Sequence, residues 1–207
     1  YRAAQRLSAE HPLRKKVQRA FADALAAVQA YQEALPLYEQ LYAEAESGAA
    51  ALDDGLTERF VTALLQVNRS DEAAAVAEGL GERARTAFEK GRAQLRGGHV
   101  RYRTGRLEGA VSYFGRAIEY FNEAGDEKAL ARAHTRAQLV YWDLGRYDRA
   151  LQHAETALRF ARDIGGPELI VALNHLGELY QDLACTARAF AAHREAMRLA
   201  VDRKELI

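Results

Sequence analysis

One alanine recurs along the chain at nearly constant spacing. Five repeat units, 37 to 40 residues apart, can be laid on the sequence from the starts Lys15, Asp54, Gly91, Ala131 and Ile170. We call the distance of a residue from the start of its unit its register position. Register position 19 is alanine in every unit: Ala34, Ala73, Ala110, Ala150 and Ala189. A period of this length is typical of an array in which each repeat is one supersecondary unit.

The fourth unit indicates what each repeat forms. From Ala133 to Leu144, apolar residues fall three, four, seven and eight residues apart, which places them on one face of a helix. The same spacing returns from Tyr147 to Ala161, and Gly145 can adopt the left-handed conformation that ends a helix. Each unit is therefore predicted to be a helical hairpin. Because both flanks of each helix are apolar, a hairpin needs neighbours.

Composition favours helix throughout. Ala, Leu, Arg, Glu and Gln dominate, the chain has only 3 prolines, and the alternation of Val, Ile and Thr that is typical of strands is absent. With 49% hydrophobic and 28% charged residues, the chain has enough apolar material for a continuous core. We expect an all-α fold, an α-α superhelix or solenoid of about five hairpins, forming a single domain over residues 1–207.

Local signals mark the boundaries between elements. Residues 1–14 resemble the tail of a preceding unit, and with Tyr1 in place of an initiator Met we expect the sequence to be part of a longer protein. Residues 47–54 and 124–127 are predicted to be loops, with Asp126 as an N-cap. Pro36 lies inside a predicted second helix, so we expect a kink or a late helix start there.

Charge and cysteine content exclude several classes. The net charge is +0 and the pI is near 7.2, so the chain as a whole has no electrostatic reason to bind nucleic acid or an anionic membrane. No run approaches the roughly 18 apolar residues of a membrane helix. The single cysteine, Cys185, cannot form an internal disulfide. These features favour a cytoplasmic protein.

The sequence offers little chemistry. The 6 histidines form no metal-binding pair on one helical face, and no glycine-rich phosphate loop is present. Paired acids such as Asp53–Asp54 and Asp71–Glu72 stand at helix starts, where they act as caps. Gly97–Gly98 lies inside a predicted helix, which indicates close helix packing. We therefore predict no catalytic residue, no metal and no cofactor, and hence no enzyme.

The hairpins resemble tetratricopeptide repeats. The matching residues are Leu176-Gly177 with Tyr180 and, in the fourth unit, Tyr141, Gly145, Tyr147 and Ala150. The resemblance runs from Lys15 to the C-terminus and is strongest from Gly91 onward. It departs in its period, which is nearer 40 than 34 residues, and in Gln29 and Asn68, which replace the turn glycine. Longer units of this kind are similar to those in regulatory regions of large bacterial transcription activators and signalling ATPases. In this chain, the segments EAGDEKALA and RDIGGPELI carry that similarity.

The resemblance implies that the free face of each first helix lines a concave groove. Helical periodicity gives the side chains on that face, and none of its apolar members, Leu95 among them, has an evident core to pack against. Tyr102 and Trp142 share register position 11, so we expect them side by side as a ligand platform; the alternative is that a broad groove shields them. The candidate groove residues are Arg92, His99, Tyr102, Arg103, Arg132, Thr135, Trp142, Asp143, Asn174 and Glu178.

Charge along this groove is uneven. Residues 82–106 contain eight Lys or Arg against two Glu, whereas residues 163–182 contain four acids and no Lys or Arg. Each run can be a solvated helix face. Direct nucleic-acid binding would need basic residues across several units, which the acidic fifth unit opposes. The family's chaperone-tail clamp is not reproduced, because Leu95 and His99 stand at its first pair of positions.

Two functions remain open. The first is a module that binds a protein or peptide in the groove, as the interaction region of a bacterial cytoplasmic regulator such as a transcription activator. The second is a small-molecule sensor whose ligand in the groove switches an attached ATPase or DNA-binding domain. The last helix, through Met197 to Ile207, has no capping helix after it, so its outer face is expected to meet more protein or to self-associate.

Overall fold

The computed structural model describes residues 12–49 and 54–204, and the regular elements in these ranges are helical. The chain divides into two compact units, residues 1–77 and 78–207. The helices from the first unit to the boundary are α1 (Pro12–Ala27), α2 (Tyr31–Glu44), a π-helical turn η2 (Ala45–Ala49), α3 (Asp54–Gln66) and α4 (Ser70–Arg83), in which the boundary falls.

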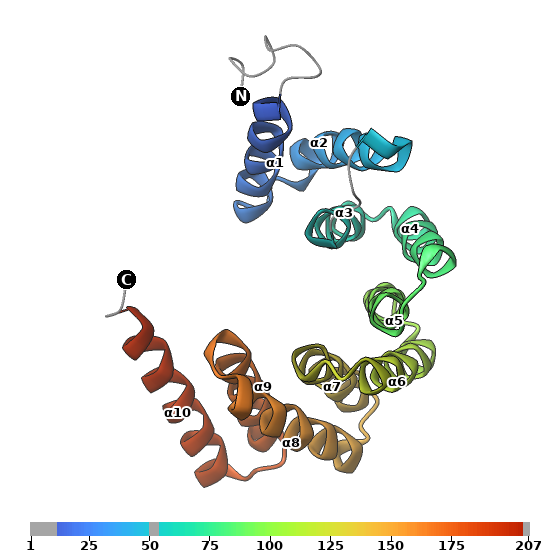
Figure 1. Ribbon diagram of the computed structural model, residues 1–207. Helices are drawn as coiled ribbons and strands as arrows, with labels where there is room; N and C mark the ends of the chain where they lie inside the picture. The colour runs from blue at the N-terminus through green and yellow to red at the C-terminus, as the bar shows by residue number, and fades with distance from the viewer. Residues whose placement is uncertain (1–11, 50–53, 205–207) are drawn as a thin grey trace. The chain divides into compact units, whose positions relative to one another are not determined.

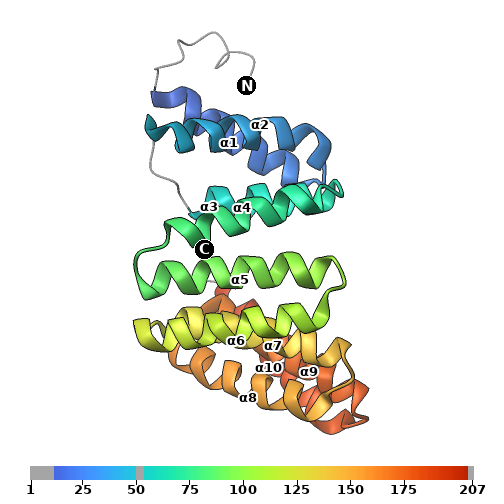
Figure 2. The same ribbon diagram turned by 90° about the vertical axis from the view of Figure 1, so that its right-hand side faces the viewer.

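The second unit is a run of hairpins in which each helix packs against the next (Figure 1). Its helices are α5 (Ala87–Arg103), α6 (Leu107–Ala124), α7 (Glu127–Asp143), α8 (Tyr147–Ile164), α9 (Gly166–Asp182) and α10 (Thr186–Lys204). The long axes of α5 and α6 lie side by side (Figure 2). The all-α class and the consecutive hairpins expected from the repeat are confirmed. The single-domain organisation over residues 1–207 stays a prediction.

The turn inside each hairpin has one backbone geometry in all five units. Register position 14 has a positive φ at Gln29 (61°), Asn68 (63°), Gly105 (73°), Gly145 (68°) and Ala184 (56°). At each turn its amide donates to the carbonyl at position 11, and the next amide donates to the carbonyl at position 10. Gly145, for example, donates to Trp142 at 2.8 Å, and Arg146 donates to Tyr141 at 2.9 Å. These two bonds satisfy carbonyls that the helix end leaves open.

The recurring alanines are the buried contact points that the repeat predicted. Ala34, Ala73, Ala110 and Ala150 are 0% exposed and Ala189 is 2% exposed. The Gly97–Gly98 pair also packs as expected: a Cβ on Gly98 would lie 2.5 Å from the Phe114 ring, so the aromatic side chain of α6 rests on the backbone of α5. Small residues therefore set the distance between neighbouring helices.

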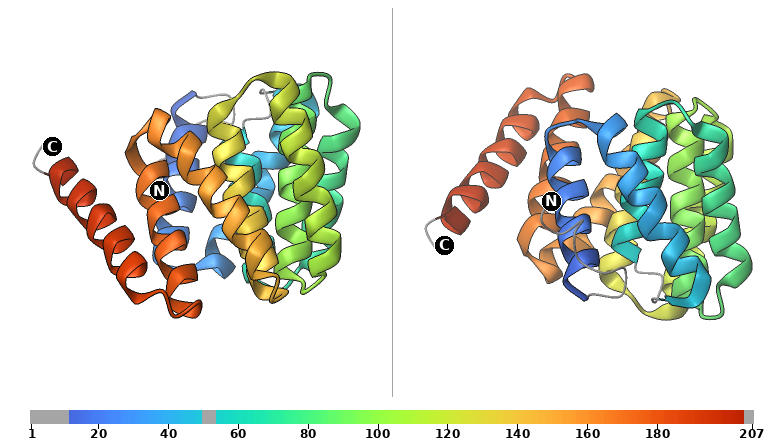
Figure 3. Two further views of the ribbon diagram at one scale, coloured as in Figure 1. Left: turned by 90° about the horizontal axis from the view of Figure 1, so that it is seen from below. Right: turned by 90° about the horizontal axis from the view of Figure 1, so that it is seen from above.

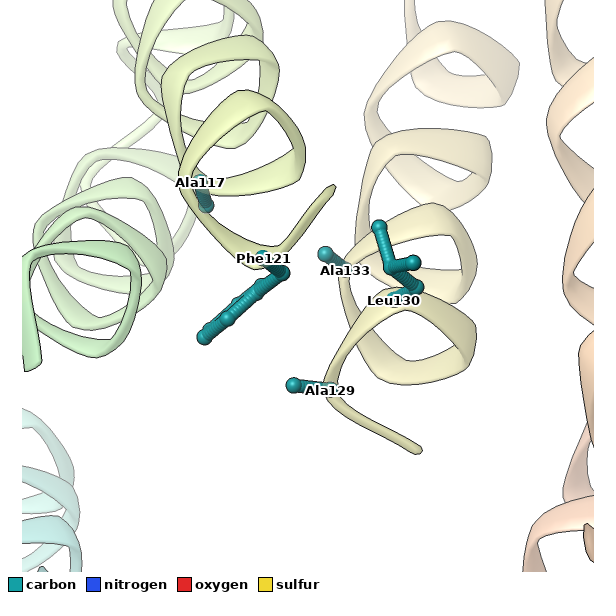
Figure 4. Close-up of a cluster of buried hydrophobic side chains, with 5 residues drawn as sticks. All are labelled: Ala117, Phe121, Ala129, Leu130 and Ala133. Carbon is teal, nitrogen blue, oxygen red and sulfur yellow. The ribbon is translucent and has the colours of Figure 1, made fainter. Parts of the chain in front are cut away.

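Apolar clusters join neighbouring hairpins of the second unit. Ala117 and Phe121 of α6 meet Ala129, Leu130 and Ala133 of α7 in one such cluster (Figure 4). Its N-terminal edge is fixed by Asp126, whose carboxylate accepts the Ala129 amide at 2.7 Å, which confirms the predicted N-cap. The loop predicted at residues 124–127 is the short break between α6 and α7.

Two local predictions in the first unit are wrong. Ser47 to Ala49 do not form a loop, because the chain continues from α2 directly into the π-helical turn. Residues 50–53, and residues 1–11 of the predicted preceding tail, lie outside the described residues; Pro12–Arg14 of that tail belong to α1. The late start predicted for the second helix, at Pro36, is also wrong, because α2 begins at Tyr31 and includes Pro36. Among the described residues, no helix is long and apolar enough to cross a membrane.

Candidate functional site

The first helices of the second unit, α5, α7 and α9, are neighbours and share a repeated polar contact. Tyr102 of α5 donates a hydrogen bond to Asp143 of α7, and Trp142 of α7 donates from Nε1 to Asp182 Oδ2 of α9 at 2.6 Å. Both pairs join register position 11 of one unit to position 12 of the next. The pKa of Tyr102 is raised, first by burial and then by the bond to the Asp143 carboxylate. These bonds tie successive first helices together.

Tyr102 and Trp142 are each half-buried against an apolar cluster, and their role as a ligand platform stays a prediction. Tyr102 packs against the cluster of Ala110, Phe114, Ala137 and Val140. Trp142 packs against the next cluster, of Ala150, Ala154, Leu176 and Leu179. Leu95 also has a core, since it contacts two clusters. The interpretation of these residues as apolar side chains without a core was wrong, because the joint between hairpins extends around the first helix as far as position 11.

His99 lies among arginines on α5 and α7. Its pKa is lowered to about 4, mainly by burial and also by the positive charges of Arg136 and Arg103. The imidazole is therefore neutral near pH 7, and the positive charge of this region comes from guanidinium groups. Arg136 was missing from the predicted set. Its signal was present in the sequence, because Arg96 and Arg136 share register position 5.

The other predicted residues make contacts within their own helix or are exposed. The guanidinium of Arg92 lies over the Phe88 ring, 5.2 Å from its centroid. Thr135 donates from Oγ1 to the Ala131 carbonyl of its own helix at 2.9 Å. Glu178 Oε2 is 3.3 Å from His175 Nδ1. Exposed side chains on the same helices are Arg103, Arg132, Asp143 and Asn174.

A histidine pair that the sequence did not predict lies inside the α7–α8 hairpin. His134 Nδ1 and His153 Nδ1 are 2.9 Å apart, and the His153 ring stacks on Tyr141 with centroids 5.2 Å apart. Burial lowers the pKa of His134 to about 4 and lowers that of His153 as well. One nitrogen must donate and the other accept, so one ring tautomer fixes the other. The search for pairs on one helix missed it because the partners face each other across the hairpin.

A pocket of about 320 Å³ lies between α9 and α10. Its lining residues are Gln181, Thr186, Ala189, Phe190 and His193. The two helices are close here because α9 carries a glycine at the crossing: a Cβ on Gly177 would lie 2.6 Å from the His193 ring. Among the described residues, no group of three or more His, Cys, Asp or Glu side chains is placed to hold a metal ion.

The fold and the joined first helices define a helical-repeat protein. Residues 89–163, which span most of the α5–α6 and α7–α8 hairpins, match the model of the tetratricopeptide repeat family. Domains of this family are typically non-catalytic and bind peptides or proteins. No curated protein sequence matches the chain.

Solved structures similar to this chain share its fold at low identity. BtubC (BKLC) from P. vanneervenii aligns over 98% of this chain and 87% of its own, with a TM-score of 0.68 and 18% identity. A putative kinesin light chain with repeats of the same kind, from Podosopora anserina, aligns over 94% and 98%, with a TM-score of 0.63 and 16% identity. The Rap conjugation gene regulator of plasmid pLS20, in complex with a Phr peptide, aligns over 88% and 52%, with a TM-score of 0.65 and 18% identity.

Proposed function

We propose that this chain is a non-catalytic module that binds a peptide or an extended protein segment on the face of α5, α7 and α9. The supporting observation is the division of charge on that face. Arg103 and Arg132 are exposed on α5 and α7, and Arg103 lies close to the neutral His99, while the exposed acids Glu178 and Asp182 are on α9. A ligand that is acidic at one end and basic or polar at the other fits this pattern.

The repeated bonds between first helices support the same role. Tyr102 with Asp143, and Trp142 with Asp182, hold three helices in a fixed order without a ligand. A face that is ordered before binding loses less conformational entropy when a ligand binds. Exposed arginines beside aromatic side chains are also the residue types that contribute most to binding at contact centres.

We further propose that the module is the interaction region of a bacterial cytoplasmic regulator. The Rap regulator with its Phr peptide has a similar fold and supports this context, although its identity to this chain is only 18%. A small-molecule sensor remains the alternative. A pocket beside Tyr102 and Trp142 would suit either function, and the 320 Å³ pocket described above is lined by α9 and α10 instead.

The test is selection of ligands from a displayed library of random 15-residue peptides, followed by affinity measurement with labelled peptides. Selected peptides should carry Asp or Glu in one half, and Arg103→Glu with Arg132→Glu should weaken their binding about tenfold or more. Arg106→Glu is the matched control, because it removes an exposed arginine at the α5–α6 turn. Peptides without acidic bias, or binding that survives the double substitution, would refute the proposed face.

A further inference from the structure

The free faces of α5, α7 and α9 differ in charge from helix to helix. These three helices lie on one side of the second unit, with α6 and α8 on the other (Figure 1), and the helices follow one another from α5, green, to α10, red (Figure 3). Register positions 1, 5, 8 and 12 are four, three and four residues apart, so they form one stripe along each first helix. The stripe of α5 has three arginines and no acid, that of α7 has two arginines and one acid, and that of α9 has two acids and no arginine. Positive charge is therefore concentrated on α5 and α7.

Two arginines from different helices lie close to the same histidine. On α5, Arg103 follows His99 by four residues, which is about one turn of helix. On α7, Arg136 is close enough for its charge to act on both His99 and Tyr102, and the charge of Arg103 acts on the same two side chains. Arg103 and Arg136 are exposed, whereas His99 is half-buried. The two guanidinium groups therefore meet solvent around His99, at the joint between α5 and α7.

The charge around His99 is positive but limited. The imidazole is neutral near pH 7, because its pKa is lowered to about 4, so it can donate one N–H without adding charge. Arg96, three residues before His99 on the same stripe, adds a third guanidinium group. Asp143, which accepts a hydrogen bond from the hydroxyl of Tyr102, supplies one negative charge. Three arginines against one aspartate leave two positive charges around one neutral donor.

This charge distinguishes between the anions that a protein segment can offer. An Asp or Glu side chain carries one negative charge on two oxygens, which a single guanidinium group can bind in bidentate fashion. A phosphoserine or phosphothreonine carries a charge of about −1.5 to −2 at pH 7 on three acceptor oxygens, and it forms charge-assisted hydrogen bonds when it meets several arginines. Two guanidinium groups on different helices, with a neutral N–H donor between them, therefore match a phosphate better than a carboxylate.

We propose that the joint between α5 and α7 binds a phosphoserine or phosphothreonine of an extended protein segment. Arg103 and Arg136 each donate to the phosphate, and the imidazole of His99 donates to its third oxygen. The segment continues toward α9, where Glu178 and Asp182 favour basic or polar residues. This inference rests on the proposed function, because it names the ligand residue that the basic end of the same face recognises.

The experiment compares three pools of fluorescein-labelled nine-residue peptides that differ only at the central residue. The centre is phosphoserine, glutamate or serine, and the four positions on each side are randomised without Asp or Glu. Fluorescence anisotropy with the full chain should give at least tenfold tighter binding for the phosphoserine pool than for the glutamate pool, because the phosphate brings a second charge and a third acceptor oxygen. The serine pool should bind most weakly.

Single substitutions test the two guanidinium groups. Arg103→Gln and Arg136→Gln should each reduce the advantage of the phosphoserine pool over the glutamate pool to about threefold or less, because one guanidinium group satisfies either anion. Arg106→Gln is the matched control and should preserve the advantage, since this exposed arginine lies at the α5–α6 turn. Circular dichroism confirms that each variant stays folded.

The outcomes separate this inference from the proposed function. Equal binding of the phosphoserine and glutamate pools would overturn phosphate recognition and leave peptide binding intact. An advantage that survives both Arg103→Gln and Arg136→Gln would place the phosphate elsewhere and overturn the site. If no pool binds, this inference is overturned, whereas the proposed function fails only if the library selection also returns no ligand. AMP and inorganic phosphate serve as competitors, and AMP that binds more tightly than the phosphoserine pool would make the ligand a nucleotide and overturn the assignment to a protein segment.

Discussion

The α1–α2 and α7–α8 hairpins share one register but are held together by different side chains. In α1–α2, the buried Gln18 donates to Gln40 Oε1 at 2.9 Å, and the fully buried Tyr38 donates to Asp23 Oδ1 at 2.8 Å. In α7–α8, the residue at the register position of Tyr38 is Ala154. The buried residues of α8 are Ala150, Ala154, Ala157 and Ala161.

The difference shows which features define this fold. Both hairpins keep a positive φ at register position 14 and a fully buried alanine at position 19, whereas the contents of the remaining interface vary. This difference explains why the comparisons match different shares of the chain. The family model, which depends on residue identities, matches residues 89–163, whereas the BtubC structure aligns over 98% of the chain.

The largest expected effect comes from enlarging the shared alanine in each hairpin. Ala34→Leu and Ala150→Leu should each destabilise the protein by about 1 to 3 kcal/mol, because extra methylene groups in a packed contact force neighbouring side chains out of place. Urea denaturation followed by circular dichroism measures the change. Ala191→Leu, at an exposed position of α10, is the control and should change stability little. Tolerance at Ala34 alone would mean that the two hairpins do not share the same close contact.

The two hairpins should differ in how acid affects their stability. Only α7–α8 contains the histidine pair, whereas α1 and α2 contain no histidine. The folded-state pKa of His134 is about 4, below its ordinary value of 6.5. The unfolded chain therefore binds more protons, and stability is lost as pH falls from about 6.5 toward 4. With the rings only partly buried and titrating as a pair, we expect a loss of about 1 to 2 kcal/mol.

The measurement is urea denaturation at pH 7.5 and pH 4.5 for the full chain and for His134→Gln. The substitution should reduce the pH dependence, although His99, with its own pKa lowered to about 4, leaves part of it. His175→Gln is the control, because that imidazole lies beside Glu178 rather than beside another histidine. An equal pH dependence in the protein and in His134→Gln would show that the pair does not carry the effect.

Features with a local cause could be predicted from the sequence, and features that join distant residues could not. The buried alanines, the Asp126 cap and the close packing at Gly97–Gly98 follow from periodicity and from the size or capping role of single residues. The His134–His153 pair depends on which faces of two helices meet across a hairpin. The burial of Trp142 depends on the next hairpin in the array, and its role in ligand binding stays a prediction.

The smallest expected effects come from the turn that the two hairpins share. Gly145 has φ 68° and open space around its missing Cβ, so Gly145→Ala has only a backbone cost, about 1 kcal/mol. The reverse change should help where a side chain already has a positive φ. Gln29→Gly and Ala184→Gly should each stabilise the protein by about 0.5 to 1 kcal/mol, because relief of left-handed strain exceeds the extra freedom of glycine in the unfolded chain.

Asn68→Gly is the internal control for these turns. Asparagine tolerates the left-handed region better than glutamine or alanine, so this change should alter stability by only a few tenths of a kcal/mol. Urea denaturation of the four variants should therefore rank them, from most to least stable, as Gln29→Gly and Ala184→Gly, then Asn68→Gly, then Gly145→Ala. If Gln29→Gly were destabilising while Ala184→Gly was stabilising, the Gln29 side chain would have to support its own turn. The α1–α2 hairpin would then differ from the others in its backbone turn as well as in its interface.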